Sequence, residues 1–214
     1  MYAKLSLAAC LGALALAGCT TVKPYDYTNF RAHPPRSILV LPPLNESTEV
    51  EGTYGYLSTV TQPIAERGYY VYPVEVIDQF LKQNGMPTAG EMHQVPLKKV
   101  TDIIGADAVL FLTLNQYGSK YVVLNSVTTV QVQAKLVDTR SGIVLWEGTG
   151  RAQQSGNGSG SLLANLIAAA ITQAINSKTD RAHQVSRIAN AQLFYAKDVG
   201  LPYGPYSPEY GKGP

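Results

Sequence analysis

Apolar and polar residues alternate without interruption over residues 129–136. Successive side chains of a strand point to opposite faces, so this alternation predicts a β-strand with one buried and one solvated face. That arrangement is typical of antiparallel sheets. Residues 138–142 have turn-forming chemistry. We therefore expect an antiparallel meander of three strands, at 108–117, 121–137 and 143–151.

The N-terminal half follows a different pattern. Residues 37–41 form a continuous aliphatic run, which is typical of a strand buried on both faces. A helix is expected at 53–67, kinked or divided at Pro63, and a second strand at 69–72. A strand, helix and strand with this spacing form a right-handed crossover, so these two strands should run parallel.

The expected fold is therefore α/β: a mixed sheet with a parallel β-α-β start followed by the meander, helices packed on the sheet, a C-terminal helix and an extended tail. Further helices are predicted at 74–84 and 96–104 from their apolar stripes. A final helix is expected at 162–177, packed on the open face of the sheet or, in its Ala-rich part, forming a self-association surface. Residues 178–194 are polar and compatible with a helix.

The first residues have the layout of a secretory signal. Lys4 precedes an uncharged apolar run that is shorter than the roughly 20 residues needed to span a bilayer. It ends in Leu16, Ala17, Gly18 and Cys19, the pattern of a lipobox. We expect cleavage between Gly18 and Cys19, a diacylglyceryl group on the Cys19 sulfur, and a third acyl chain, palmitate, on the new amine. Two or more chains hold a protein stably on a membrane.

Four segments follow from this interpretation: a lipoprotein signal peptide at 1–18, a lipid-anchored tether at 19–36, a single α/β domain at 37–194 and a Pro/Gly/Tyr-rich tail at 195–214. The chain has two cysteines, Cys10 and Cys19. The first would leave with the signal and the second would carry lipid. No disulfide is then expected within the mature chain, and the core alone must stabilise the fold.

The tail repeats proline at every third residue between Pro202 and Pro208, which is the period of a polyproline II helix. Tyr203 and Tyr206 would then share one face. Two alternatives remain open, a disordered end and an extended segment that docks on this domain or on a partner. In the second case Tyr203, Tyr206 and Tyr210 are the expected partner-binding residues.

No catalytic or metal-binding motif is present in the sequence. The three histidines, His33, His93 and His183, are far apart and have no partner at metal-ligand spacing. There is no phosphate-binding loop, nucleophile elbow or dinucleotide fingerprint. The net charge of +2 gives no nucleic-acid signal. We therefore expect a protein that is not an enzyme, with no cofactor, no metal and no nucleic-acid partner.

A resemblance to a known family rests on seven stretches that cover most of the chain after the signal. They are Cys19 to Tyr27, Pro35 to Ser47, Ala65 to Val71, Phe80 to Gly85, Gly105 to Ala108, Leu136 to Asp138 and Leu145 to Gly148. These stretches resemble a family of Gram-negative lipoproteins that includes a meningococcal vaccine-candidate antigen. The resemblance implies an outer-membrane lipoprotein and no particular activity. Thr20 agrees with outer-membrane sorting, because in enterobacteria an Asp at that position retains lipoproteins in the inner membrane.

A more distant similarity involves the strand after Gly105 and the hairpin from Leu136 to Trp146. These parts are similar to the N-terminal domain of the Tol translocation protein and to curli-secretion and penicillin-binding-protein-activator lipoproteins. The similarity implies a compact α/β domain used for envelope assembly or binding.

The leading functional hypothesis is a binding or scaffold component of envelope assembly, secretion or transport. It would be held in the outer membrane through lipidated Cys19, form a homodimer and join an envelope protein complex. The alternatives are a ligand-binding or hydrolytic envelope protein and a surface antigen. Whether the domain faces the periplasm or the cell surface stays open.

Overall fold

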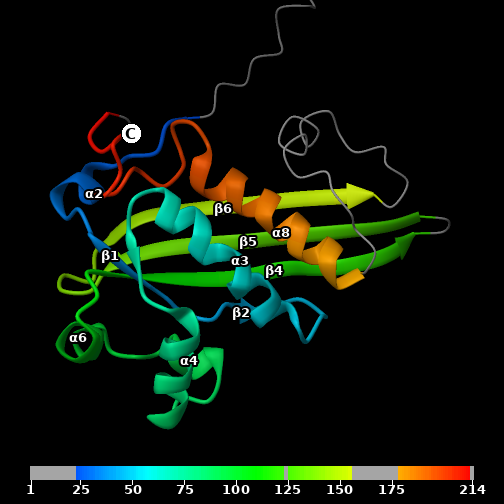
Figure 1. Ribbon diagram of the computed structural model, residues 1–214, viewed down its shortest axis with the longest axis horizontal. Coiled ribbons are helices and arrows are strands. Elements are labelled where there is room, and N and C mark those ends of the chain that lie inside the picture. Colours follow the sequence, from blue (N-terminus) through cyan, green and yellow to red (C-terminus); the bar gives the residue numbers. More distant parts are fainter. Residues whose placement is uncertain (1–22, 123–124, 156–177, 213–214) are drawn as a thin grey trace, which may run out of the picture.

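The structure, a computed structural model (Figure 1), describes residues 23–122, 125–155 and 178–212. This part of the chain forms one mixed sheet of six strands in the order β3-β1-β4-β5-β6, with β2 beside β4. The bounds are β1 Ser37–Val40, β2 Leu44–Asn45, β3 Tyr70–Val71, β4 Ala108–Val122, β5 Asn125–Asp138 and β6 Val144–Ser155. β1 is parallel to β3 and β4, and β2 is parallel to β4, whereas the β4–β5 and β5–β6 pairs are antiparallel. The predicted mixed α/β class is confirmed.

β1 is buried on both faces, as its continuous aliphatic run predicted. Ile38 and Val40 belong to the larger apolar cluster, between the sheet and helices α3 (Gly52–Glu66) and α8 (Lys178–Tyr195). Leu39 and Leu41 belong to a second cluster on the opposite face. The strand therefore separates two cores.

The second core is formed by a chain of short helices. They are α4 (Val74–Gln83), α5 (Ala89–Met92), α6 (Leu97–Lys99) and the π-helix η1 (Val100–Ile104). The helices expected at 74–84 and 96–104 are confirmed, and the second ends at Gly105, whose φ of 80° suits glycine. α5 was not predicted from the sequence, and it begins with a capping box between Thr88 and Glu91.

Small residues on β6 let α8 approach the sheet closely. The face of β6 toward α8 carries Trp146, Gly148, Gly150 and Ala152, so the one large side chain of these four, Trp146, lies at one end of the contact. A Cβ added at Gly150 would lie 2.4 Å from the carbonyl oxygen of Ala189 on α8. Trp146 instead stacks near Phe194, with ring centroids 5.8 Å apart.

Pro63 lies inside α3, yet the helix is continuous from Gly52 to Glu66. Of the two expected outcomes, a kink or a division, the division was therefore wrong. Proline lacks the N–H that would otherwise bond the carbonyl four residues earlier, which here belongs to Thr59. The buried Asn190 amide of α8 donates to that carbonyl at 3.0 Å instead. The Asn190 oxygen in turn accepts a hydrogen bond from the Tyr56 hydroxyl.

The two terminal segments of the described chain pack together at one end of the sheet (Figure 1). α2 (Thr28–Ala32) places Phe30 in the core, and Tyr27 donates to the Gly200 carbonyl at 2.6 Å. The Tyr25 amide bonds the Asp198 carbonyl at 2.8 Å. Within the segment 19–36, the residues from Tyr25 onward therefore belong to the packed domain.

One strand boundary was predicted wrongly. Residues 118–120 were expected outside the strands, but they lie inside β4, with Gly118 paired to Thr129. β4 continues to Val122, so Tyr121 and Val122 belong to β4 rather than to β5. A bulge at Asn115, between Leu114 and Gln116, shifts the register and hides the continuity of the alternation.

The lipobox at 16–19 and the helix expected at 162–177 lie outside the described residues. Residues 178–194, which the sequence only allowed to be helical, form α8 together with Tyr195, which was expected in the tail. Among the helices that the structure describes, none is long and apolar enough to cross a membrane.

Candidate partner-binding site

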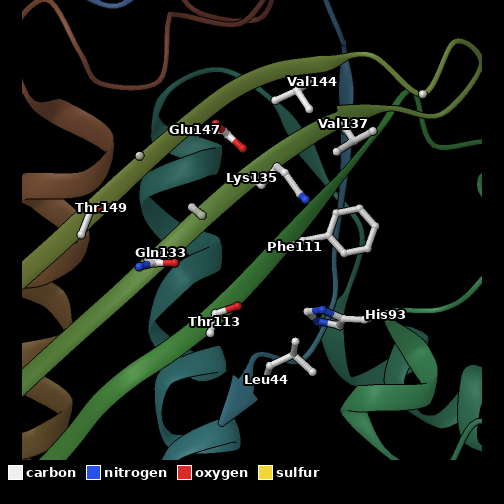
Figure 2. A pocket seen from close by; sticks show the side chains of 13 residues that line it. Leu44, His93, Phe111, Thr113, Gln133, Lys135, Val137, Val144, Glu147 and Thr149 are labelled. Carbon is white, nitrogen blue, oxygen red and sulfur yellow. The ribbon is translucent and has the colours of Figure 1, made fainter. Parts of the chain in front are cut away.

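The face of the meander opposite α8 forms a depression of about 770 Å³ that opens to solvent (Figure 2). Its floor is formed by the alternate residues of β4, β5 and β6 that point away from the packed core, most of which are polar. The floor side chains are Phe111 and Thr113 of β4, Gln133 and Lys135 of β5, and Glu147 and Thr149 of β6. Leu44 and His93 stand at one side (Figure 2).

His93 is fixed by contacts on two sides. Its Nε2 donates to the Pro42 carbonyl at 2.9 Å, because a carbonyl oxygen only accepts. Its ring meets the edge of Phe111 at 5.3 Å between centroids. Burial lowers the pKa of His93 and nearby Lys135 lowers it further, while the Pro42 carbonyl acts in the opposite direction. The neutral ring therefore presents Nδ1 as its remaining acceptor.

Opposite charges face each other across two strands of the floor. Lys135 and Glu147 are register partners on β5 and β6, and both are exposed. Within the described residues neither forms an ion pair. Both charges are thus open to a partner that brings complementary groups.

The side chains that line the depression can contact a partner through apolar area, hydrogen bonds and charge. The lining offers an aromatic ring, an amide, two hydroxyls and one charge of each sign, and it contains no serine, cysteine or aspartate. Phe111 is half-buried, so the surface also provides some apolar contact. In the described part of the chain, no group of three or more His, Cys, Asp or Glu side chains is placed to hold a metal ion.

The tail tyrosines predicted for partner binding lie away from this depression and differ among themselves. Tyr203 is half-buried, and its ring lies 4.3 Å from the Arg67 guanidinium carbon. Tyr206 is 68% exposed and Tyr210 is 48% exposed. The chain turns from Pro205 onward rather than continuing as an extended helix, so Tyr203 and Tyr206 do not have equivalent surroundings.

Arg67 is a residue that the sequence did not single out. It is buried, its guanidinium lies over Tyr195 and Tyr203 at 5.0 and 4.3 Å, and its Nε has no hydrogen-bond partner. The Arg67 and Gly68 carbonyls accept the amides of Gly204 and Tyr206. The link between α3 and the tail joins residues more than a hundred positions apart, and one sequence carries no signal for such a pairing.

His93 and Lys135 were likewise not predicted as neighbours. The alternation in β5 placed Lys135 on the solvated face, but nothing in the sequence indicated that the loop carrying His93 borders that face.

A family model described as "Putative lipoprotein GNA1162-like" matches residues 25–206. The chain belongs to this family. A putative lipoprotein of Neisseria meningitidis serogroup B is 46% identical over 183 residues, covering 84% of this chain and 85% of the relative. The crystal structure of lipoprotein GNA1162 from Neisseria meningitidis is also 46% identical and covers 64% of this chain and 95% of that one, with a TM-score of 0.57. The resemblance stated from the sequence is thus confirmed.

A weaker likeness extends beyond the GNA1162-like family. The C-terminal domain of LpoB from Salmonella enterica is 18% identical and covers 56% of this chain and 83% of that one, with a TM-score of 0.41. A likeness at this level says nothing about what the present chain binds.

Proposed function

We propose that this GNA1162-like lipoprotein is a non-catalytic binding component of the envelope, held in the outer membrane through acylated Cys19. It binds its protein partner, or a second copy, on the open face of β4–β6. The observation that supports this most directly is the depression itself. It combines a half-buried aromatic ring with two exposed opposite charges, and its lining has no nucleophile paired with a base.

The shape of the depression, rather than its volume, favours a protein contact over a small ligand. Depressions of about 300–1,000 Å³ are typical of ligand sites. Here, however, the floor is a flat arrangement of strand side chains that ends at no enclosing wall beyond His93 and Leu44 (Figure 2). An aromatic ring with polar groups around it resembles the centre and rim of a protein interface.

The test is photocrosslinking in living cells from single positions. A photoreactive amino acid at Gln133 should give discrete adducts, and Lys135→Glu should weaken them by reversing one floor charge. Gln79 is the matched control because it is also an exposed glutamine, but it lies on α4. Equal adducts at Gln79 and Gln133, or none at Gln133, would refute the proposed surface.

The anchor is tested separately. Mass spectrometry of the mature protein should find acyl groups on Cys19, and Cys19→Ala should yield an uncut or soluble product. Unmodified Cys19 in the wild type would overturn the membrane part of the proposal without affecting the crosslinking result.

A further inference from the structure

We propose that residues 203–210 of the tail lie against the lipid surface in which Cys19 is anchored, with Tyr206 and Tyr210 in the polar layer of the bilayer. This inference rests on the proposed function, because it requires acylated Cys19. It adds an orientation: one end of the domain touches the membrane, and the end where β4 stops and β5 begins points away.

The first step is the reach of the anchor. The Tyr25 amide is bonded to the Asp198 carbonyl, so the chain is fixed to the domain from Tyr25 onward. Only six peptide steps separate Cys19 from Tyr25, which span at most about 22 Å when fully extended. The end of the domain that holds Tyr25 therefore cannot move far from the membrane.

The second step is what that end presents. Asp198, to which Tyr25 is bonded, begins the segment that leads into the tail. The Tyr27 hydroxyl bonds Gly200 and the Tyr69 hydroxyl bonds the Pro202 carbonyl at 2.7 Å. Figure 1 shows α2 and the C-terminal end side by side at this end of the sheet, while the β4–β5 hairpin extends to the other end.

The third step is that the tail is held in place. Tyr203 stacks on the buried Arg67, and the amides of Gly204 and Tyr206 bond the carbonyls of Arg67 and Gly68 at 2.7 and 3.1 Å. Gly204 fits tightly, since an added Cβ would lie 2.4 Å from the Gly68 carbonyl oxygen. Tyr206 and Tyr210 are thus presented from a docked segment.

The fourth step is the chemistry of the exposed residues. Among the described residues, eight large hydrophobic side chains are exposed, and Tyr206 is the most exposed aromatic among them. Tyrosine has an apolar ring and a polar hydroxyl, so it is enriched where a membrane meets water. Residues 196–212 carry two lysines and two acids, so the tail has no net charge to attract or repel a lipid surface. We expect the contact to depend little on lipid charge.

The test places a fluorescent donor at one position of the full, acylated chain and an acceptor on the lipid headgroups. The mature chain has no cysteine besides Cys19, so acylation leaves a single introduced thiol for labelling. The donor is attached at Lys212→Cys in the tail or, as a control, at Lys120→Cys near the far end of β4. Both lysines are exposed. A strand of 15 residues spans about 50 Å, so the two positions should differ strongly in energy transfer.

In vesicles of phosphatidylethanolamine with phosphatidylglycerol, transfer should be high at position 212 and near background at 120. It should be the same in phosphatidylcholine vesicles. Tyr206→Ser combined with Tyr210→Ser should lower transfer at 212, whereas Tyr54→Ser should not. Tyr54 is a matched control, 51% exposed on the first turn of α3.

Three results would overturn the orientation: equal transfer at both positions, no effect of the double tyrosine variant, or transfer that appears only at high protein density, which would indicate contact with a second copy. If mass spectrometry finds Cys19 without acyl groups, the anchor fails and this inference fails with it. If Cys19 is acylated and transfer is equal at both positions, only the orientation fails.

Discussion

The two faces of the β4–β6 meander are made by alternate residues of the same strands, yet they differ in what they contact. The face toward α3 and α8 carries Val130, Val132 and Leu136, all fully buried, and its glycines admit α8. The opposite face carries Gln133, Lys135 and Glu147, all exposed. The first face is specified by packing, and the second is free to carry a binding function. Substitutions one residue apart should therefore have very different effects.

The largest difference is expected between Trp146 and Glu147. Trp146→Ala removes a fully buried ring that packs near Phe194 and donates to the Val199 carbonyl at 2.9 Å. Such a truncation costs about 3–5 kcal/mol of unfolding free energy, whereas Glu147→Ala should change it by less than about 0.5 kcal/mol. Urea unfolding followed by far-ultraviolet circular dichroism measures both, since the variant has lost its only tryptophan. Similar losses would contradict the assignment of the two faces.

The next effect concerns the polar contact between the two helices on the packed face. Asn190→Ala removes a hydrogen-bond partner of the buried Thr59 carbonyl and of the buried Tyr56 hydroxyl. We expect this to lower the unfolding free energy by about 2–3 kcal/mol. Gln192→Ala, at an exposed position of the same helix, should cost less than about 0.5 kcal/mol.

A second substitution tests the physical reason. Pro63→Ala restores an N–H to α3, which can bond the Thr59 carbonyl. The loss caused by Asn190→Ala should then be smaller by about 1 kcal/mol in the Pro63→Ala background. Strict additivity of the two substitutions would show that Asn190 does not replace the missing helix hydrogen bond.

A smaller effect is expected from the close contact of β6 and α8. Gly150→Ala places a Cβ against the Ala189 carbonyl, so α8 must shift, and we expect a loss of about 2 kcal/mol in unfolding free energy. Thr149→Ala, its neighbour on the exposed face, should cost less than about 0.5 kcal/mol. Chemical denaturation followed by tryptophan fluorescence compares the two variants. A neutral Gly150→Ala would mean that the helix does not depend on this approach.

Local patterns in the sequence predicted the sheet and its two kinds of strand. The alternation at 129–136 identified the antiparallel part and the run at 37–41 identified a strand between two cores, because both signals arise from burial of the strand itself. Details that depend on a distant segment were missed. Short β2 follows β1 but is a strand only through pairing with β4. The bulge at Asn115 concealed the end of β4.

The candidate sites show the same limit. The polar residues at alternate positions of β5 predicted an exposed face. The depression, however, is also bordered by the loop with His93, which lies about 40 residues earlier in the chain. The tail tyrosines were identified by composition and period. Their fixed placement depends on Arg67, whose guanidinium packs against the rings of Tyr195 on α8 and Tyr203 in the tail.

The smallest effect concerns the pH dependence of the open face, through His93. Burial lowers the pKa of His93 in the folded protein; the Pro42 carbonyl opposes this and nearby Lys135 adds to it. The unfolded chain has a histidine pKa of about 6.5. The unfolded state therefore takes up a proton at a higher pH than the folded state. The contribution of His93 to stability is present above about pH 6.5 and declines as the pH falls toward the folded pKa. His93→Gln keeps a donor for the Pro42 carbonyl and removes the titration. The difference in unfolding free energy between pH 7.5 and pH 5 should thus be smaller in His93→Gln than in the wild type. An unchanged difference would show that His93 is protonated as readily in the folded protein as in the unfolded chain.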